Sequence, residues 1–220
     1  MSDDPASGGK EGGPKFRRRA SARPDEVLDA ALALFTRQGF ERTTVEEIAR
    51  RAGLSKGAVY LYFPSKKALL QGLVRRAVSP VADDALAMLA GHRGDPRPVI
   101  RALMAMFAAK LGDGAALAVP KLVVREAAGA PDIARMYREE ILDRALPAMI
   151  ALLEQGIAGG HIRAVNPEMT VRSIIGPLLA HVLLSEVFGI RPADGMAIGR
   201  LVENHLSILF AGLEPERTAP

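Results

Sequence analysis

The pattern of apolar and polar positions predicts helices along most of the chain. Beyond about residue 98, Ala, Leu, Met and Val recur at helical spacing, and no stretch alternates as a half-buried strand would. We expect helices there at about 98–111, 120–128, 132–158, 167–188 and 193–212. The sequence therefore predicts an all-α fold.

Local signals refine these helices. Asp132 and Asn166 are candidate N-caps, and Pro167 suits a first helical position. Pro147 and Pro177 fall inside predicted helices, where we expect bends.

Two short helices joined by a tight turn are predicted nearer the N-terminus. Thr44 and Glu47 form a capping-box pattern, which indicates that a helix begins there. Gly53 suits the left-handed conformation that ends a helix, and Ser55 suits the cap of the next one. One face of the first helix is apolar, made of Val45, Ile48, Ala49 and Ala52. This spacing is typical of the helix-turn-helix DNA-binding motif, whose second helix enters the major groove.

The second short helix, from Lys56 to about Tyr62, is unusual in what it leaves exposed. Val59 and Phe63 are expected to pack inward, which leaves two tyrosines for solvent or a partner. A lysine at a helix N-terminus favours phosphate, hydroxyls donate to phosphate oxygens, and small or apolar side chains suit a thymine methyl group. The candidate DNA contacts are Ser55, Lys56, Gly57, Ala58, Tyr60, Leu61 and Tyr62, with Thr43 and Thr44 as further phosphate donors.

Longer helices are predicted on either side of this pair. Pro24 suits the first position of a preceding helix that Gly39 closes, completing a three-helix domain. Ser65 is a candidate cap for the following helix, and Pro80 is expected to kink or end it.

Composition and charge narrow the class of protein. The 220 residues are 49% apolar, which is enough for a substantial core, and they include no cysteine. Residues 15–76 carry fourteen Lys/Arg against six Asp/Glu, although the net charge of the whole chain is only +4. Basic charge around a helix-turn-helix indicates a polyanionic partner, while a merely solvated surface is the alternative. We see no signal peptide and no apolar run of about 18 residues, so we expect a cytoplasmic protein without membrane contact.

The same features suggest a domain organisation. We expect a disordered basic arm at 1–20, the helix-turn-helix domain at 21–80, a helical domain at 81–213 and a tail at 214–220. The arm could track phosphates or simply solubilise the chain. Gly212 is expected to end the last helix.

Catalytic chemistry has no visible basis in the sequence. The four histidines, His92, His161, His181 and His205, are scattered, and no hydrolase elbow, phosphate loop or dinucleotide fingerprint is present. We therefore expect no enzyme, no metal and no cofactor.

A small-molecule site in the C-terminal helices is more plausible than catalysis. Such sites are apolar cavities with a few polar anchors, although core packing would use the same residues. The best polar anchors are His181 and Tyr137, and Glu126 would select a cation. The candidate lining residues are Leu103, Met104, Phe107, Val123, Glu126, Met136, Tyr137, Ile174, Leu178 and His181.

Residues 23–78 carry the pattern T-T-V-x-x-I-A-x-x-A-G-x-S-K-G-x-x-Y-x-Y-F-x-S-K-x-x-L-L, which resembles the N-terminal domain of TetR family transcriptional regulators. Residues 121–160 also resemble C-terminal domains of TetR regulators related to efflux control. The resemblance implies an all-helical homodimer of about nine helices per chain, usually a repressor that leaves its operator when a small molecule binds. It also implies that Lys66 contacts a phosphate.

The same resemblance places the dimer interface on the last two long helices. The residues expected in this seam are Leu179, Val182, Leu183, Val187, Leu201, His205 and Ile208. The leading interpretation is thus a homodimeric regulator that binds a palindromic double-stranded operator and a small effector. The alternative is a helical small-molecule-binding or partner-binding protein without specific DNA binding.

Overall fold

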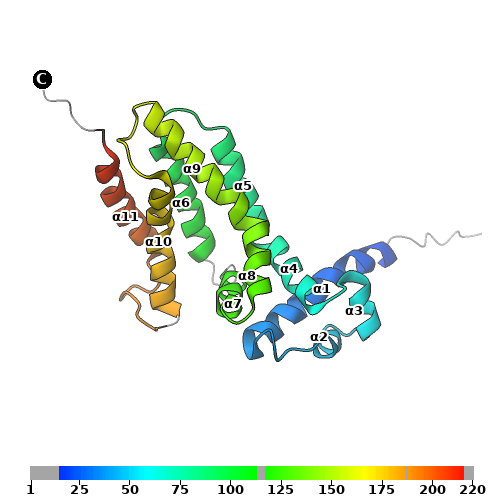
Figure 1. Ribbon diagram of the computed structural model, residues 1–220. Coiled ribbons are helices and arrows are strands. Elements are labelled where there is room, and N and C mark those ends of the chain that lie inside the picture. Colours follow the sequence, from blue (N-terminus) through cyan, green and yellow to red (C-terminus); the bar gives the residue numbers. More distant parts are fainter. Residues whose placement is uncertain (1–14, 113–116, 187, 216–220) are drawn as a thin grey trace, which may run out of the picture. The chain divides into compact units, whose positions relative to one another are not determined.

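The chain is helical throughout the part that the structure describes. This computed structural model describes residues 15–112, 117–186 and 188–215 (Figure 1). Helices α1 to α11 lie in these ranges, more than the nine or so expected, because two of the expected helices are divided. The chain separates into two compact units between Leu69 and Leu70.

The first unit contains three helices and the start of a fourth. They are α1 (Lys15–Gln38), α2 (Val45–Arg51), α3 (Lys56–Tyr62) and the first residues of α4 (Lys66–Ala77). Helix α1 packs against both α2 and α3, as expected for a three-helix domain. The side chains that close this core are less than 10% exposed; they include Val27, Ala31, Leu34, Phe35, Ile48 and Val59.

Helix α1 begins earlier than expected. It starts at Lys15, so Pro24 lies inside the helix and not at its first position, and residues 15–20 belong to α1 and not to a disordered arm. Arginine and alanine, which dominate this segment, are good helix formers. An internal proline removes only one backbone hydrogen bond, although its ring also disfavours a straight helix. Residues 1–14 of the expected arm lie outside the described ranges.

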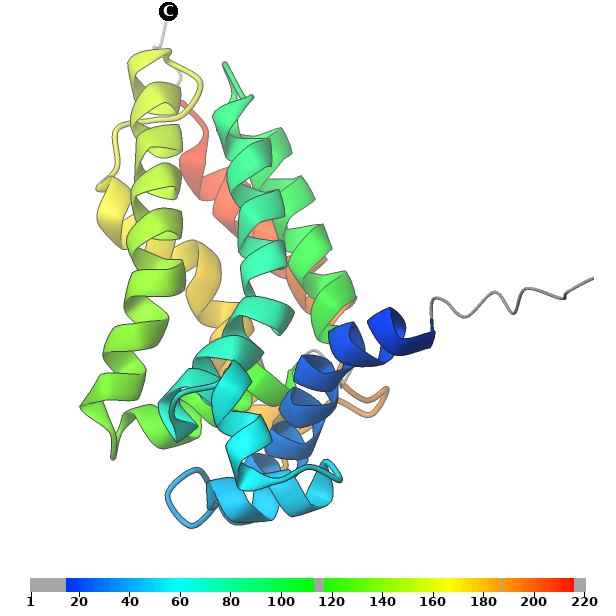
Figure 2. The ribbon, with the colours of Figure 1, turned by 90° about the vertical axis from the view of Figure 1, so that its right-hand side faces the viewer.

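The second unit is a bundle built around one apolar core. It contains the end of α4 with α5 (Ser79–Ala90), α6 (Pro96–Gly112), α7 (Ala118–Ala127), α8 (Pro131–Tyr137), α9 (Asp143–Ala158), α10 (Pro167–Glu186) and α11 (Ile198–Leu213). Figures 1 and 2 show α9 beside α5 and α6 beside α11, as the contacts between these helices require. Apolar residues of α5, α6, α9, α10 and α11 form the core.

Helix α9 comes very close to the start of α6. A Cβ atom added at Gly156 would lie 2.7 Å from Cγ and 2.8 Å from Cδ of Pro96. Because a proline ring cannot swing aside, only glycine fits this crossing without displacing backbone.

The helix expected at 132–158 is interrupted by a π segment, η1 (Arg138–Leu142). Glu140 in η1 accepts hydrogen bonds from Gln71 Nε2 at 2.6 Å and from Arg75 Nη2 at 2.6 Å, both on α4. These bonds hold the pKa of Glu140 below its usual value, with Arg75 as the larger cause. A second ion pair, Arg144 with Asp83 at 2.7 Å, joins α9 to α5.

Several other helix ends differ from expectation. Helix α8 starts at Pro131, which takes the first helical position and leaves Asp132 in the first turn, so Asp132 is not the cap. Helix α11 starts at Ile198 and not near 193, because Gly195 and Ala197 have positive φ angles of 83° and 44°. It ends at Leu213, one residue beyond Gly212.

Other local predictions are confirmed. Asn166 Oδ1 accepts from the Met169 amide at 3.0 Å, and Ser65 Oγ accepts from the Ala68 amide at 3.0 Å. The chain breaks into two helices at Val78, because α4 ends at Ala77 and α5 begins at Ser79 with Pro80 in its first turn. The expected domain boundary near residue 80 is later than the division after Leu69, since Gln71 and Arg75 already bond to Glu140 of the second unit.

No helix in the described ranges combines the length and the apolar character needed to cross a bilayer.

Candidate nucleic-acid interface

The turn between α2 and α3 is built by local polar contacts. Thr44 Oγ1 accepts from the Glu47 amide at 3.3 Å, and Glu47 Oε2 accepts from the Thr44 amide at 2.9 Å, which completes the capping box. Gly53 has a φ of +66°, a conformation that a residue with a Cβ adopts only with strain. Ser55 Oγ then accepts from the Ala58 amide at 3.2 Å and begins α3.

The capping box is also tied to the end of α1. Gln38 Nε2 donates to Glu47 Oε2 at 3.2 Å. The Thr44 amide, followed by the Thr44 hydroxyl, holds the pKa of Glu47 below its usual value. The carboxylate that caps α2 therefore also fixes α2 against α1.

Helix α3 turns one side inward and leaves the other open. Val59 is fully buried, whereas Tyr60 is 41%, Leu61 84% and Tyr62 37% exposed. Ser55, Lys56 and Gly57 are exposed as well, and Ala58 is half-buried. A seven-residue helix that displays two tyrosines and a leucine has a surface suited to a partner.

Gly57 lies at an open point on this surface. A Cβ atom added there would meet no other atom of the chain within 4 Å. Its lack of a side chain therefore has no packing reason within the described part of the protein.

Lys56 is held from two sides. Its ammonium group forms an ion pair with the carboxylate of Glu46 in the first turn of α2, and it lies 5.8 Å from the centre of the Tyr60 ring. The hydrogen bond between Lys56 and Glu46 lowers the pKa of Glu46 and raises the pKa of Lys56. This pair did not emerge from the sequence, because residues 46 and 56 are on different helices and show no helical spacing.

Two of the residues predicted to contact DNA are engaged within the protein. Lys66 Nζ donates to the carbonyl oxygens of Phe40 at 2.8 Å and Glu41 at 3.0 Å, and it lies 4.5 Å from the centre of the Phe40 ring. Thr43 is 1% exposed, and its hydroxyl donates to the Gly39 carbonyl at 2.7 Å. Both side chains shape the turn between α1 and α2, so this geometry does not favour them as phosphate ligands.

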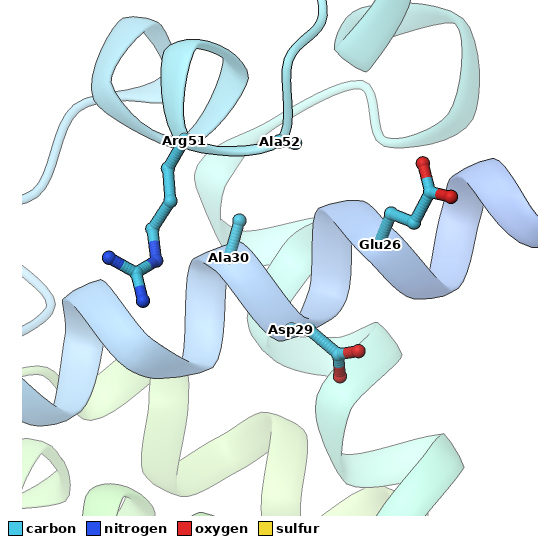
Figure 3. A pocket seen from close by; sticks show the side chains of 5 residues that line it. All are labelled: Glu26, Asp29, Ala30, Arg51 and Ala52. Atoms are coloured by element: carbon cyan, nitrogen blue, oxygen red, sulfur yellow. The ribbon is translucent and has the colours of Figure 1, made fainter.

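An open depression lies between α1 and the end of α2. Its lining residues are Glu26, Asp29, Ala30, Arg51 and Ala52. Figure 3 shows Arg51 extending from α2 toward α1, which carries both carboxylates. A lining of two acids and one guanidinium does not suit an apolar effector.

Half of the predicted effector-binding residues meet in the core of the second unit. Leu103, Met104, Ile174 and Leu178 are buried there, and Phe107 packs against them. Val123 on α7 and Met136 on α8 are also buried, on two helices that contact each other. These apolar residues thus fall into two groups, one in the core and one at α7 and α8.

Of the three predicted polar anchors, two bond to other groups of the protein and the third is largely buried. The His181 ring bonds through Nε2 to the Met196 carbonyl oxygen. Glu126 pairs with Arg125 at 2.9 Å. Tyr137 is largely buried, and this burial raises the pKa of its hydroxyl.

The predicted dimer seam includes side chains that are conspicuously exposed. Leu179 is 61% and Leu183 44% exposed on α10, and Ile208 is 66% exposed on α11, a helix that contacts α10. Leu184, which the sequence reasoning missed, is 43% exposed. Val182, Leu201 and His205 are half-buried, and Val187 lies outside the described residues.

The capped turn, the exposed face of α3 and the all-helical second unit define a helix-turn-helix transcriptional regulator. No three His, Asp or Glu residues of the described ranges gather where they could hold a metal ion.

Comparison with protein families supports this class and identifies the family. Residues 27–73 match the model described as bacterial regulatory proteins, tetR family, and residues 92–204 match the tetracyclin repressor-like C-terminal domain. The second match alone spans more than half of the chain, so the chain belongs to the TetR family of DNA-binding transcriptional regulators.

Individual relatives agree with this assignment. An uncharacterized HTH-type transcriptional regulator of Bacillus subtilis, YfiR, is 29% identical over 68% of this chain and 72% of its own length. The Escherichia coli regulator RutR is 40% identical over 39% of this chain and 38% of its own length.

A solved structure covers nearly the whole fold. The complex of SmeT with triclosan has a TM-score of 0.72 at 25% identity, covering 90% of this chain and 95% of that one. SmeT is the repressor of the multidrug efflux pump SmeDEF of Stenotrophomonas maltophilia.

Proposed function

We propose that this chain is a homodimeric repressor that binds a palindromic operator through α3 and leaves it when a small apolar molecule binds the second unit. The observation that carries the DNA contact is the exposure of Lys56, Gly57, Tyr60 and Tyr62 on α3, with open space at Gly57. An ammonium and two hydroxyls suit phosphate oxygens, while Leu61 suits a thymine methyl group.

We propose a DNA-contact set smaller than the one expected from the sequence. We retain Thr44, Ser55, Lys56, Gly57, Ala58, Tyr60, Leu61 and Tyr62, which are exposed or partly exposed. We leave out Thr43, whose one hydroxyl donor serves the Gly39 carbonyl, and Lys66, two of whose three donors serve the carbonyls of Phe40 and Glu41 in the turn before α2.

The proposal of an apolar effector is supported by the residues of the second unit. Met104 lies in the core with Phe107 packed against it, and a methionine side chain adapts to varied ligand shapes. The SmeT complex holds triclosan in a related fold. Dimerisation is supported by the exposed leucines of α10 and by Ile208, since exposed apolar patches mark interaction sites.

Selection of bound fragments from genomic DNA tests this function. We expect enrichment of a palindrome whose half-sites lie about one helical turn apart, about 34 to 36 Å, or a multiple of that spacing. Affinity for the selected duplex should fall by orders of magnitude between about 50 and 200 mM salt, because several phosphates are neutralised. Recovery of no preferred sequence, together with salt-insensitive binding, would reject a DNA-binding role for this chain.

Neighbouring genes of the selected site then indicate candidate effectors. A compound that releases the protein from its duplex in a fluorescence anisotropy titration, and that does not bind free DNA, identifies the effector class. If the compounds that bind the protein all strengthen its binding to DNA, the proposed release by an effector is wrong.

A further inference from the structure

The ion pair between Glu46 and Lys56 places a negative charge on the surface proposed for DNA. Glu46 lies in the first turn of α2 and Lys56 opens α3, so the pair bridges the two helices of the motif. Both side chains are about half exposed, at 56% and 49%, so the pair can open into solvent without disturbing the core.

A DNA phosphate and the Glu46 carboxylate need the same group. An ammonium has three donor hydrogens but a single positive charge, so a carboxylate in contact with it weakens its net attraction for a phosphate. Both partners are charged at neutral pH, and their pairing favours the charged forms further by lowering the pKa of Glu46 and raising the pKa of Lys56. A phosphate that approaches Lys56 therefore meets a carboxylate already in contact with it.

We propose that Glu46 limits the affinity of this protein for DNA by competing with a backbone phosphate for Lys56. This inference rests on the proposed DNA contact of α3. Since a phosphate contact carries no sequence information, Glu46 lowers the affinity for operator and non-operator duplexes by the same factor. Glu46 thus lowers the affinity for DNA and makes the complex dissociate more readily.

Glu46→Gln tests the proposal directly. We expect about two- to fivefold tighter binding, the range that exposed ion pairs span, on both the selected operator and a duplex of scrambled sequence. Since Lys56 then releases a counterion from the duplex, the slope of log affinity against log salt should steepen by up to about 0.9 per protomer. Fluorescence anisotropy at several salt concentrations measures both quantities.

A double-mutant cycle isolates the route through Lys56. In the Lys56→Met background, Glu46→Gln should give no gain. A gain that persists there means that Glu46 repels the duplex without acting on Lys56, which overturns the proposal. Equal or weaker binding by Glu46→Gln in the native background overturns it as well.

Two further variants separate the effect of removing a negative charge from the effect of breaking the ion pair between Glu46 and Lys56. Glu41→Gln removes the same charge from an exposed position before α2 and should change affinity less than Glu46→Gln does. Glu46→Asp keeps the charge and shortens the reach to Lys56, so its affinity should lie between those of the native protein and Glu46→Gln. Circular dichroism melts of all variants verify that the fold is intact.

This test distinguishes failure of the inference from failure of the proposed function. If the native protein binds no duplex at low salt, the function is wrong. If it binds and Glu46→Gln behaves like the native protein, only the role of Glu46 is wrong.

Discussion

Single polar side chains decide where the helices of the DNA-binding unit begin and how they are joined. The side chains of Thr44 and Ser55 each accept a hydrogen bond from a backbone amide at the start of a helix. Gly53 supplies the positive φ angle of the turn between them. Lys66 fixes the preceding turn by donating to two backbone carbonyls. The position of α3 therefore depends on a few short-range contacts as well as on the apolar core.

The open position at Gly57 leads to a prediction at this scale. Gly57→Ala should raise the free energy of unfolding by up to about 1 kcal/mol, because alanine favours a helix and the new methyl group meets no atom of the chain. It should weaken operator binding roughly tenfold, equivalent to about 1.4 kcal/mol, if the duplex approaches the backbone there. Urea unfolding and fluorescence anisotropy measure the two effects.

Gly212→Ala is the matched control. Gly212 is an exposed glycine of α11 whose added Cβ would also meet nothing within 4 Å. This variant should gain stability without losing DNA affinity. If Gly57→Ala keeps full affinity, close approach of the duplex at Gly57 is refuted.

Sequence reasoning succeeded for the site where local rules govern. The caps at Thr44, Ser55 and Asn166 and the glycine turn follow from interactions within a few residues, and all are present. The partners of Lys56 and Lys66 depend on how separate segments fold together, so spacing along the chain held no signal for them.

At the scale of single elements, the most informative feature is the π segment between α8 and α9. Its residue Glu140 binds both Gln71 and Arg75 of α4, and it is the shared acceptor of these bonds. Periodicity alone predicted one unbroken helix over 132–158, because the apolar spacing continues through the segment. Wide turns of this kind occur frequently at functional sites.

The lowered pKa of Glu140 leads to a pH prediction. A carboxyl group with a depressed folded-state pKa stabilises the fold above its unfolded pKa, about 4.3, and loses this contribution as the pH falls through the folded value. Glu140→Gln should therefore cost about 1 kcal/mol at pH 7, reduced by solvent screening of Arg75, and the difference from the native protein should narrow below about pH 4.3.

Thermal unfolding followed from pH 7 to about pH 3 checks this. Glu139→Gln, at the exposed neighbouring position, removes the same charge without removing the acceptor of Gln71 and Arg75, and should change the melting temperature less. A difference between Glu140→Gln and the native protein that widens toward acid would contradict the stated role of the ion pair.

On the scale of the whole molecule, the described residues of α10 and α11 include several large apolar side chains that are exposed. Leucines 179, 183 and 184 and Ile208 all expose more than two-fifths of their area. The sequence named most of this face through family resemblance, but it missed Leu184, because helical spacing alone does not tell which side of an apolar helix faces its own core.

Leu183→Glu tests whether this face joins two protomers. We expect a monomer in sedimentation velocity, because a charge placed in a symmetric seam meets its own copy and must lose its water. Operator affinity should then fall by orders of magnitude, since two linked reading helices bind far more tightly than one.

Val124→Glu supplies the control for surface charge. Val124 on α7 is 68% exposed, and the same substitution there should leave the sedimentation coefficient unchanged. A dimeric Leu183→Glu protein would place the interface elsewhere.

The π segment also affects where the chain can lose a residue without disturbing the core. A π turn holds one residue more than an α-helical turn, so deletion of one residue within Arg138–Leu142 would tighten the turn and keep Ile133 and Leu153 in phase. The same deletion within α9 would rotate every later side chain by about 100° and carry Leu153 out of the core. We therefore expect the fold to tolerate deletion of one residue at this turn, at the cost of the hydrogen bonds from Gln71 and Arg75 to Glu140.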